Sequence, residues 1–199
     1  MSVIFDIPRK QIVQVQLDVL SKWCNKYRPK YIVEVGSWLG KSTSVFGKYA
    51  KDNGATVIAV DWWQDNPDVG LFVNRYGLDV RRQFLNNMFD LGLAKNVTSL
   101  EMQSSDAAKL INNGSVDMIF IDADHRYSRV SDDLRNWYPK LKNKGVICGH
   151  DFEAFEYDED FIEVDVHEGR HHGVIKAVTE FFGDRVIQEE RMWLVEENQ

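Results

Sequence analysis

The segment at residues 31–43 limits the fold of this chain more than any other. It starts with the β-branched and aromatic run Tyr31-Ile32-Val33, turns at Gly36 and Gly40, and continues as a helix-forming stretch from Lys41. A strand that leads through a glycine turn into a helix offers backbone N–H groups and a partial positive charge to a ligand. Glycine lets the backbone approach that ligand closely, because no Cβ intervenes. We therefore predict a binding site in this turn.

Short apolar runs and helical stripes alternate along the rest of the chain. We predict helices at residues 10–27, 41–51, 79–91, 106–111, 128–141 and 174–182. We predict strands at residues 31–35, 56–60, 97–102, 116–121, 144–149, 185–188 and 192–195. This alternation favours an α/β fold with a mostly parallel sheet and helices on both faces. Ligands of such sheets bind beyond the carboxyl ends of the strands, where the polar candidates of this sequence fall.

The composition is that of one globular domain. Of the 199 residues 44% are hydrophobic and 28% are charged, so we expect a single domain over residues 1–199. Within it we expect an N-terminal helical segment at residues 1–29 and an acidic insertion covering the acceptor site at residues 152–172. The net charge of −7, without a basic face, argues against a nucleic-acid partner.

The sequence also bears on the compartment. No apolar run approaches the ~20 residues of a membrane span, and the N-terminus lacks the layout of a signal peptide. Cys24 and Cys148 lie far apart in apolar segments, which is typical of core residues in a reducing compartment. We expect a cytoplasmic protein that acts on a small molecule without a membrane partner, and we leave a homo-oligomer open.

Three ligands compete for the glycine turn: a nucleoside triphosphate, a dinucleotide and S-adenosylmethionine (SAM). A phosphate loop needs four residues between its glycines, whereas three separate Gly36 from Gly40. The dinucleotide fingerprint needs a glycine at position 38, where this chain has Trp38. Both deviations favour the third ligand. A phosphate-loop kinase or NTPase built on residues 36–43 stays an alternative, as does a non-catalytic protein that keeps the fold.

The pattern acidic-x-Gly-x-x-x-Gly-x-Ser, from Glu34 to Ser42, resembles the first motif of class I SAM-dependent methyltransferases. The resemblance covers about residues 30–195 and is closest to the catechol O-methyltransferase and macrocin O-methyltransferase types. Further segments carry it: Asp61-Trp62-Trp63, Ser104-Ser105-Asp106, residues 121–127, Asp132-Asp133-Leu134, residues 144–147 and His150-Asp151. It implies a Rossmann-like, seven-stranded, mostly parallel sheet with an antiparallel last strand.

The resemblance also implies a set of cofactor-binding residues. They are Glu34, Gly36, Ser37, Trp38, Gly40, Ser42, Asp61, Trp62, Ser104, Ser105, Asp106 and Asp122. The turn would cup the methionine part of SAM, Asp61 would accept the ribose hydroxyls, and Trp62 or Trp63 would stack on adenine. Asp61 has a second interpretation as a turn cap, and Ser104 to Asp106 have one as a helix N-cap.

Methyl transfer to a hydroxyl needs a base or a bound cation that makes the acceptor nucleophilic. The resemblance assigns His125 as the base, with Asp122 beside it, and Asp122, His150 and Asp151 as ligands of a divalent cation. Two carboxylates suit Mg²⁺, whereas the imidazole of His150 shifts the preference towards Mn²⁺, Fe²⁺ or Zn²⁺. The predicted activity is therefore O-methylation of a small-molecule hydroxyl, of a sugar or a natural product, with metal assistance left open. The second interpretation of His125 is a core histidine bonded to Asp151 or Asp124.

Three more histidines, His167, His171 and His172, lie near the end of the acidic insertion. Their spacing matches no closed tetrahedral zinc set, and no cysteine lies nearby. We expect them to be incidental to the chemistry.

Overall fold

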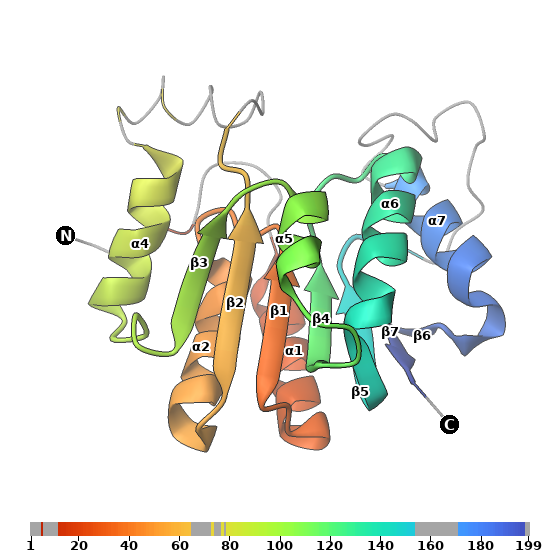
Figure 1. The fold of residues 1–199 in the computed structure, drawn as a ribbon, viewed down its shortest axis with the longest axis horizontal. Helices are drawn as coiled ribbons and strands as arrows, with labels where there is room; N and C mark the ends of the chain where they lie inside the picture. Colours follow the sequence, from red (N-terminus) through yellow and green to blue (C-terminus); the bar gives the residue numbers. More distant parts are fainter. Residues whose placement is uncertain are drawn as a thin grey trace. The chain divides into compact units, whose positions relative to one another are not determined.

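The computed structural model describes residue 5, residues 12–64, 73, 77, 79–153 and 171–197 (Figure 1). The chain divides into two compact units, Met1–Gln103 and Ser104–Gln199. The described residues contain seven strands in the sheet order β3-β2-β1-β4-β5-β7-β6. This mixed sheet with flanking helices confirms the predicted fold class.

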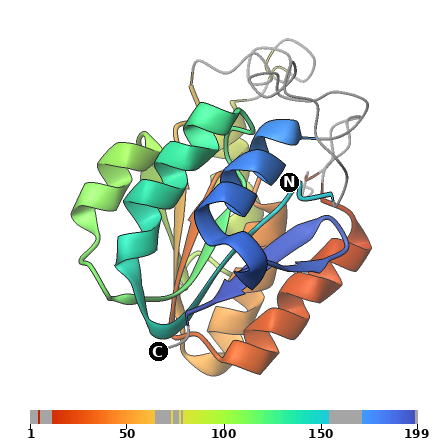
Figure 2. The same ribbon diagram turned by 90° about the vertical axis from the view of Figure 1, so that its right-hand side faces the viewer.

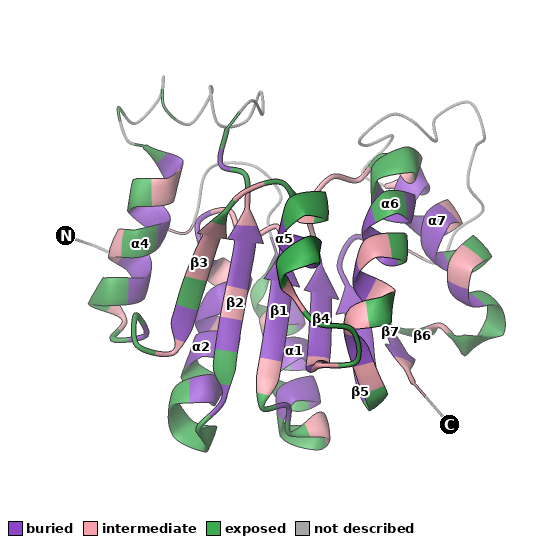
Figure 3. Ribbon diagram, in the orientation of Figure 1, coloured by how far each residue is buried: buried purple, intermediate pink, exposed green. Residues whose placement is uncertain are grey.

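The first unit has three parallel strands. Its elements are α1 (Gln14–Tyr27), β1 (Tyr31–Val35), α2 (Lys41–Asn53), β2 (Thr56–Asp61), α4 (Val80–Asp90) and β3 (Val97–Glu101). β1 pairs with β2 and β2 with β3, so that Val35 lies opposite Val60 and Asp61 opposite Glu101. β1 is buried over almost its whole length, as expected for an apolar strand between two neighbours (Figure 3).

The second unit combines parallel and antiparallel strands. Its elements are α5 (Ser104–Leu110), β4 (Val116–Ile121), α6 (Tyr127–Trp137), η1 (Tyr138–Lys140), β5 (Leu141–Gly149), α7 (His172–Phe182), η3 (Gly183–Arg185), β6 (Ile187–Glu189) and β7 (Met192–Glu196). β4 and β5 are parallel, whereas β7 is antiparallel to both β5 and β6. Figure 2 shows α6 and α7 packed side by side, in teal and blue.

Most predicted bounds agree with the structure, and those of β1 and β4 are identical. The α6 helix ends at Trp137 rather than at residue 141, because Pro139 lacks an N–H and the chain continues as a 3-10 turn. α5 starts at Ser104, two residues earlier than predicted, and β5 already starts at Leu141. Residues 154–170 of the predicted insertion lie outside the described residues.

Among the described helices none is long and apolar enough to cross a membrane. Cys24 and Cys148 are both buried thiols, as expected for core residues. Burial raises the pKa of the Cys24 thiol to about 12, so this thiol stays protonated and inert.

Candidate active site

The buried side chain of Glu34 stabilises the glycine turn between β1 and α2. This buried carboxylate accepts hydrogen bonds from the hydroxyls of Ser37, at 2.8 Å, and Thr43. Three of the five residues from Gly36 to Gly40 have a positive φ angle: +90° at Gly36, +45° at Trp38 and +85° at Gly40. Glu34, in β1, therefore connects the start of the turn at Ser37 with the first turn of α2 at Thr43.

Asp61, at the end of β2, holds the same turn from the other side. Its Oδ2 accepts from the backbone N–H of Ser37 at 2.9 Å and of Trp38 at 2.8 Å. Its Oδ1 accepts from the backbone N–H of Trp63 at 2.8 Å. Burial raises the pKa of this carboxyl, against the opposite effect of these amides. Asp61 thus acts as a turn cap, which also accepts from the backbone N–H of Trp62. Its predicted contact with ribose stays a prediction.

The two neighbouring tryptophans differ in environment. Trp63 is 5% exposed, donates from Nε1 to the carbonyl of Trp38 at 2.8 Å, and has its ring centroid 5.0 Å from that of Phe84. Trp62 is 37% exposed. Trp63 is therefore the packing residue of the pair, and Trp62 is the one with an aromatic face available to a ligand.

Packing gives Gly40 a reason to be glycine in addition to the predicted close approach to a ligand, which stays a prediction. A Cβ at this position would lie 2.6 Å from Cε of Met88 and 2.9 Å from Cδ2 of Phe84, both on α4. Asn87 of the same helix donates from Nδ2 to the carbonyl of Leu39 at 2.8 Å. α4 therefore packs directly on the turn and supports it, a contact that the motif alone does not reveal.

Ser104, at the start of α5, is engaged in helix packing. Its hydroxyl bonds to the carboxylate of Asp133 and accepts from Trp137 Nε1 at 2.8 Å, both on α6. Burial raises the pKa of Asp133 to about 7, while the Ser104 hydrogen bond opposes this. Ser105 and Asp106 are exposed, and Asp106 pairs with Lys109 at 2.8 Å. The predicted adenine contacts of these three α5 residues stay predictions.

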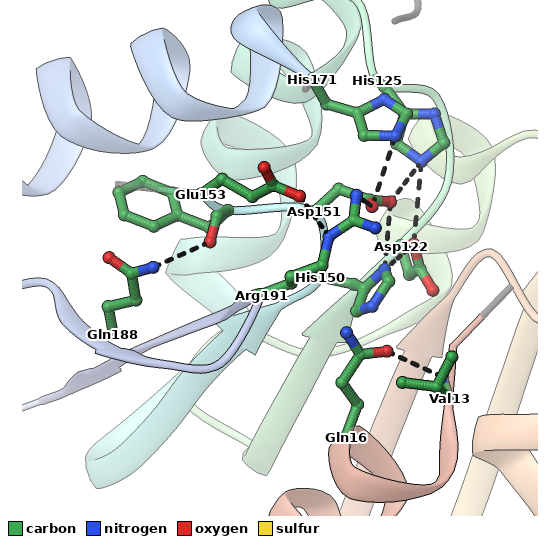
Figure 4. A network of polar contacts seen from close by, with 11 residues as sticks. Val13, Gln16, Asp122, His125, His150, Asp151, Glu153, His171, Gln188 and Arg191 are labelled. Atoms are coloured by element: carbon green, nitrogen blue, oxygen red, sulfur yellow. Dashed lines mark hydrogen bonds and ion pairs between the residues drawn. The ribbon is translucent and has the colours of Figure 1, made fainter. Parts of the chain in front are cut away.

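The second unit gathers an Asp–His cluster that comes from the ends of β4 and β5, the start of α7 and the β6–β7 turn (Figure 4). We call it the Asp151 cluster. Its members are Asp122, His125, His150, Asp151, His171 and Arg191. Asp151 lies at its centre. Oδ2 lies 3.0 Å from both His125 Nε2 and His150 Nδ1, whereas Oδ1 lies 3.3 Å from His171 Nε2 and 2.9 Å from Arg191 Nη2.

The backbone forces Asp151 into this central position. Its φ of +56° is unusual for a residue with a side chain. Hydrogen bonds on both sides maintain that conformation: His150 N donates to Ile121 O at 3.2 Å, and Phe152 N donates to Arg191 O at 2.9 Å. Burial works against the charge of Asp151, but the hydrogen bonds from His125 and His150 outweigh it and hold its pKa well below the usual range. Asp151 is therefore a fixed carboxylate anion.

Asp122, the remaining member of the cluster, lies at longer distances from the histidines. Asp122 Oδ1 lies 3.8 Å from His125 Nε2 and 3.7 Å from His150 Nδ1. Burial lowers the pKa of His150, but the Asp122 and Asp151 carboxylates more than compensate and the net direction is upward. A recess of about 10 Å³, bordered by Asp122, His125 and His150, has room for about one water molecule.

Two ambiguities of the sequence are resolved by these contacts. Asp124 pairs with Arg126, whose Nε lies 3.0 Å from Oδ1, so the partner carboxylate of His125 is Asp151. His171, expected to be incidental to the chemistry, has its ring 4.1 Å from that of His125 and contacts Asp151, so it belongs to the cluster, and whether it takes part in the chemistry stays untested. Arg191 was not predicted at all. No local motif marks either residue, since both reach the cluster only through the tertiary fold. His167 lies outside the described residues.

Two sets of potential metal ligands occur among the described residues. One consists of Asp122, His150 and Asp151, the set predicted from the sequence, and the other of His125, Asp151 and His171. In each set the ligand atoms lie within 4.8 Å of one another.

The strand order and the helices define a Rossmann-like fold of the class I methyltransferase type. The profile of the methyltransferase-domain family matches residues 33–152, and the chain belongs to this family. The uncharacterized protein y4gI of Sinorhizobium fredii is 32% identical over 133 residues, which are 65% of this chain and 14% of that protein. The chain thus spans about a seventh of the length of this curated relative.

Solved methyltransferases share the fold at low sequence identity. The O-methyltransferase TomG of Streptomyces achromogenes, involved in tomaymycin synthesis and solved with SAM, has a TM-score of 0.69 and 13% identity over 97% of this chain and 84% of its own. The O-methyltransferase of Bacillus cereus, solved with S-adenosylhomocysteine (SAH), has a TM-score of 0.65 and 16% identity over 95% and 84%. The SAH-bound methyltransferase PaMTH1 of Podospora anserina has a TM-score of 0.69 and 14% identity over 95% and 80%.

Proposed function

We propose that this protein is a SAM-dependent methyltransferase that methylates a hydroxyl group of a small molecule, of the sugar or natural-product class. Family membership supports methyl transfer, and two solved neighbours are O-methyltransferases with bound SAM or SAH. The family match crosses the boundary between residues 103 and 104, which supports the proposal that both units belong to one domain.

The first unit contains groups that fit SAM. The N-terminus of α2 follows the glycine turn, and its first N–H groups have no partners within the helix, which suits the carboxylate of the methionine part. Ser42 in the first turn of α2, the Asp61 carboxylate and the exposed ring of Trp62 would hold the carboxylate, the ribose and the adenine, respectively. SAM supplies an electrophilic methyl carbon on a sulfonium, so the chain itself has to position and deprotonate the acceptor.

The observation that carries the proposal is the 3.0 Å contact between His125 Nε2 and Asp151 Oδ2. A fixed carboxylate holds the proton on Nε2 and leaves the lone pair of the neutral ring on Nδ1. Nδ1 then takes the proton of the acceptor hydroxyl, and Asp151 stabilises the imidazolium that results. His125 is 24% exposed, so a substrate can reach it.

The predicted divalent cation also stays part of the proposal. Asp122, His150 and Asp151 would hold it, and it would supply a Lewis acid that increases the acidity of a hydroxyl. One imidazole and two carboxylates fit Mn²⁺, Fe²⁺ or Zn²⁺ better than Mg²⁺, which prefers oxygen ligands.

Calorimetry with SAM and SAH tests the cofactor assignment. We expect both to bind and ATP–Mg²⁺ not to bind; if neither SAM nor SAH binds, the proposed function is wrong. Catalysis is tested by SAH release over a panel of catechols, sugars and phenolic natural products. His125→Ala is expected to lower turnover about 10²-fold or more with unchanged SAH affinity. An unchanged turnover would remove His125 from the mechanism.

A further inference from the structure

The second ligand set of the Asp151 cluster has no role in the proposed reaction beyond the His125–Asp151 pair. It places two imidazoles and one carboxylate around a common centre. We propose that His125, Asp151 and His171 form a binding site for a first-row transition-metal ion, for which Zn²⁺ is the probe. This site shares Asp151 with the predicted set at Asp122, His150 and Asp151 but takes its imidazoles from different residues.

The distances suit such an ion. The ring nitrogens lie 3.0 Å (His125 Nε2) and 3.3 Å (His171 Nε2) from the Asp151 oxygens. Metal–ligand bonds of about 2.0–2.1 Å at tetrahedral to octahedral angles place neighbouring ligand atoms about 2.8–3.4 Å apart. The two nitrogens contact different oxygens of Asp151, and all three ligand atoms lie within 4.8 Å of one another, so side-chain rotations bring them around one ion. Three protein ligands leave at least one coordination position open.

The backbones that carry these ligands are held in place. The carbonyl of His171 accepts from Val174 N at 3.1 Å and from Ile175 N at 3.2 Å, at the first turn of α7. Asp151 is fixed by the hydrogen bonds of its two chain neighbours. The side chains of His125, Asp151 and His171 are 24%, 9% and 13% exposed. The site is thus largely preorganised and still reachable from solvent.

Charge limits the cluster to one ion at a time. Two divalent cations and Arg191 would face three carboxylates at short range, Asp122, Asp151 and Glu153, and Glu153 is already paired with Arg191 at 2.6 Å. Of the two sets, the one with His125 and His171 offers two imidazoles, which transition metals prefer, against one in the set with His150. His150 is also only 6% exposed. Zn²⁺ is therefore expected at His125, Asp151 and His171, and while bound there it excludes the proposed activating cation from Asp122, His150 and Asp151.

A bound ion has a consequence that rests on the proposed function. When Nε2 of His125 binds a metal, the single proton of the neutral ring moves to Nδ1, because each nitrogen carries either a proton or a lone pair. Nδ1 then cannot accept the proton of the acceptor hydroxyl. Zn²⁺ is therefore expected to inhibit the methyl transfer that His125 promotes.

Zn²⁺ titration of the metal-free full-length protein, followed by calorimetry without SAM, tests the site. We expect one Zn²⁺ per chain, and His171→Ala should weaken binding about 10²-fold. His150→Gln is the matched control, because it removes an imidazole that belongs only to the other set while its amide can still donate to Asp151, and it should change affinity by less than about threefold. Circular dichroism and thermal unfolding of both variants establish that they are folded.

Each other outcome overturns the proposal. If the wild type binds no Zn²⁺ at micromolar concentration, or if His171→Ala binds as tightly as the wild type, the site does not exist. If His150→Gln loses as much affinity as His171→Ala, the ion does not select His125 and His171 over His150. Inhibition is measured separately: Zn²⁺ that binds with the expected pattern but leaves turnover unchanged refutes the role of His125 as base and leaves the metal site standing.

Discussion

At the scale of single residues, Asp151 determines the state of the whole cluster. One carboxylate accepts from two histidines through Oδ2 and contacts His171 and Arg191 through Oδ1. Because burial normally favours the neutral acid, these cationic and N–H partners are what keep it ionised. An ionised Asp151 in turn selects the tautomer of His125. The chemistry assigned to the histidine thus depends on a residue that never contacts the acceptor proton.

Asp151→Asn tests this dependence. The amide keeps the shape of the side chain but can no longer stabilise an imidazolium, so turnover is expected to fall about 10²–10⁴-fold with little change in SAH affinity. Asp124→Asn is the control, since Asp124 belongs to the same segment as His125 but pairs with Arg126. We expect its effect on turnover to be less than about threefold. Equal losses in both variants would contradict the assignment of Asp151 as the partner of His125.

At the scale of elements, α2 lies between two left-handed glycines with different surroundings. Gly40 caps its N-terminus with φ +85°, and Gly54 caps its C-terminus with φ +63°. A Cβ at Gly54 meets nothing within 4 Å, whereas one at Gly40 meets α4. The flexible end of Met88 can move aside, but the ring of Phe84 cannot do so without disturbing Trp63. Packing against α4 thus adds to the backbone requirement at Gly40.

Gly40→Ala and Gly54→Ala separate these two effects. Left-handed backbone alone costs about 1–2 kcal/mol for alanine, which is the expected destabilisation for Gly54→Ala. Overpacking adds about 1–3 kcal/mol at Gly40, so Gly40→Ala should lose about 2–5 kcal/mol. Urea unfolding of both variants measures the difference. Similar free energies of unfolding for the two variants would mean that α4 does not press on the turn.

The contact between α5 and α6 contains a buried acid, Asp133, whose pKa burial raises to about 7. Its folded pKa is higher than its unfolded pKa, so the folded state binds more protons between about pH 4 and pH 7. The free energy of unfolding is therefore highest, as far as this group is concerned, below about pH 4. It decreases as the pH rises, until Asp133 is ionised in the folded state as well, above about pH 7. A rise from 3.8 to about 7 corresponds to a cost of up to about 4 kcal/mol at pH 8.

Asp133→Asn removes that titration. The variant is expected to have a higher Tm than the wild type at pH 8 and about the same Tm at pH 4, because asparagine cannot ionise and still reaches the Ser104 hydroxyl. Asp106→Asn, at an exposed position of α5 that pairs with Lys109, should leave the pH profile unchanged. A pH profile of Asp133→Asn that parallels the wild type would show that Asp133 does not carry this dependence.

At the scale of the whole molecule, the sequence predicts the fold better than the site. Strands such as β1 and β4 are readable because their apolar runs end abruptly at polar, chemistry-bearing residues like Asp122. His171 is 20 positions beyond Asp151, and its approach depends on where α7 starts in space, which no local pattern encodes. Likewise, the sequence alone does not distinguish Trp62 from Trp63. In the structure Trp63 is buried against Phe84, whereas Trp62 is exposed.

The two compact units raise the question of whether the chain unfolds in one step. The family profile covers residues 33–152 and therefore needs parts of both units, so we expect neither to be stable without the other. Hydrogen exchange followed by mass spectrometry in increasing urea should give the same midpoint for peptides of β1 and β2 as for peptides of β4 and β5. Saturating SAH should raise both midpoints equally, by RT ln(1 + [L]/Kd) in free energy. Two separate midpoints, with only one of them responding to SAH, would divide the chain into two independent domains and confine the cofactor to the unit that responds.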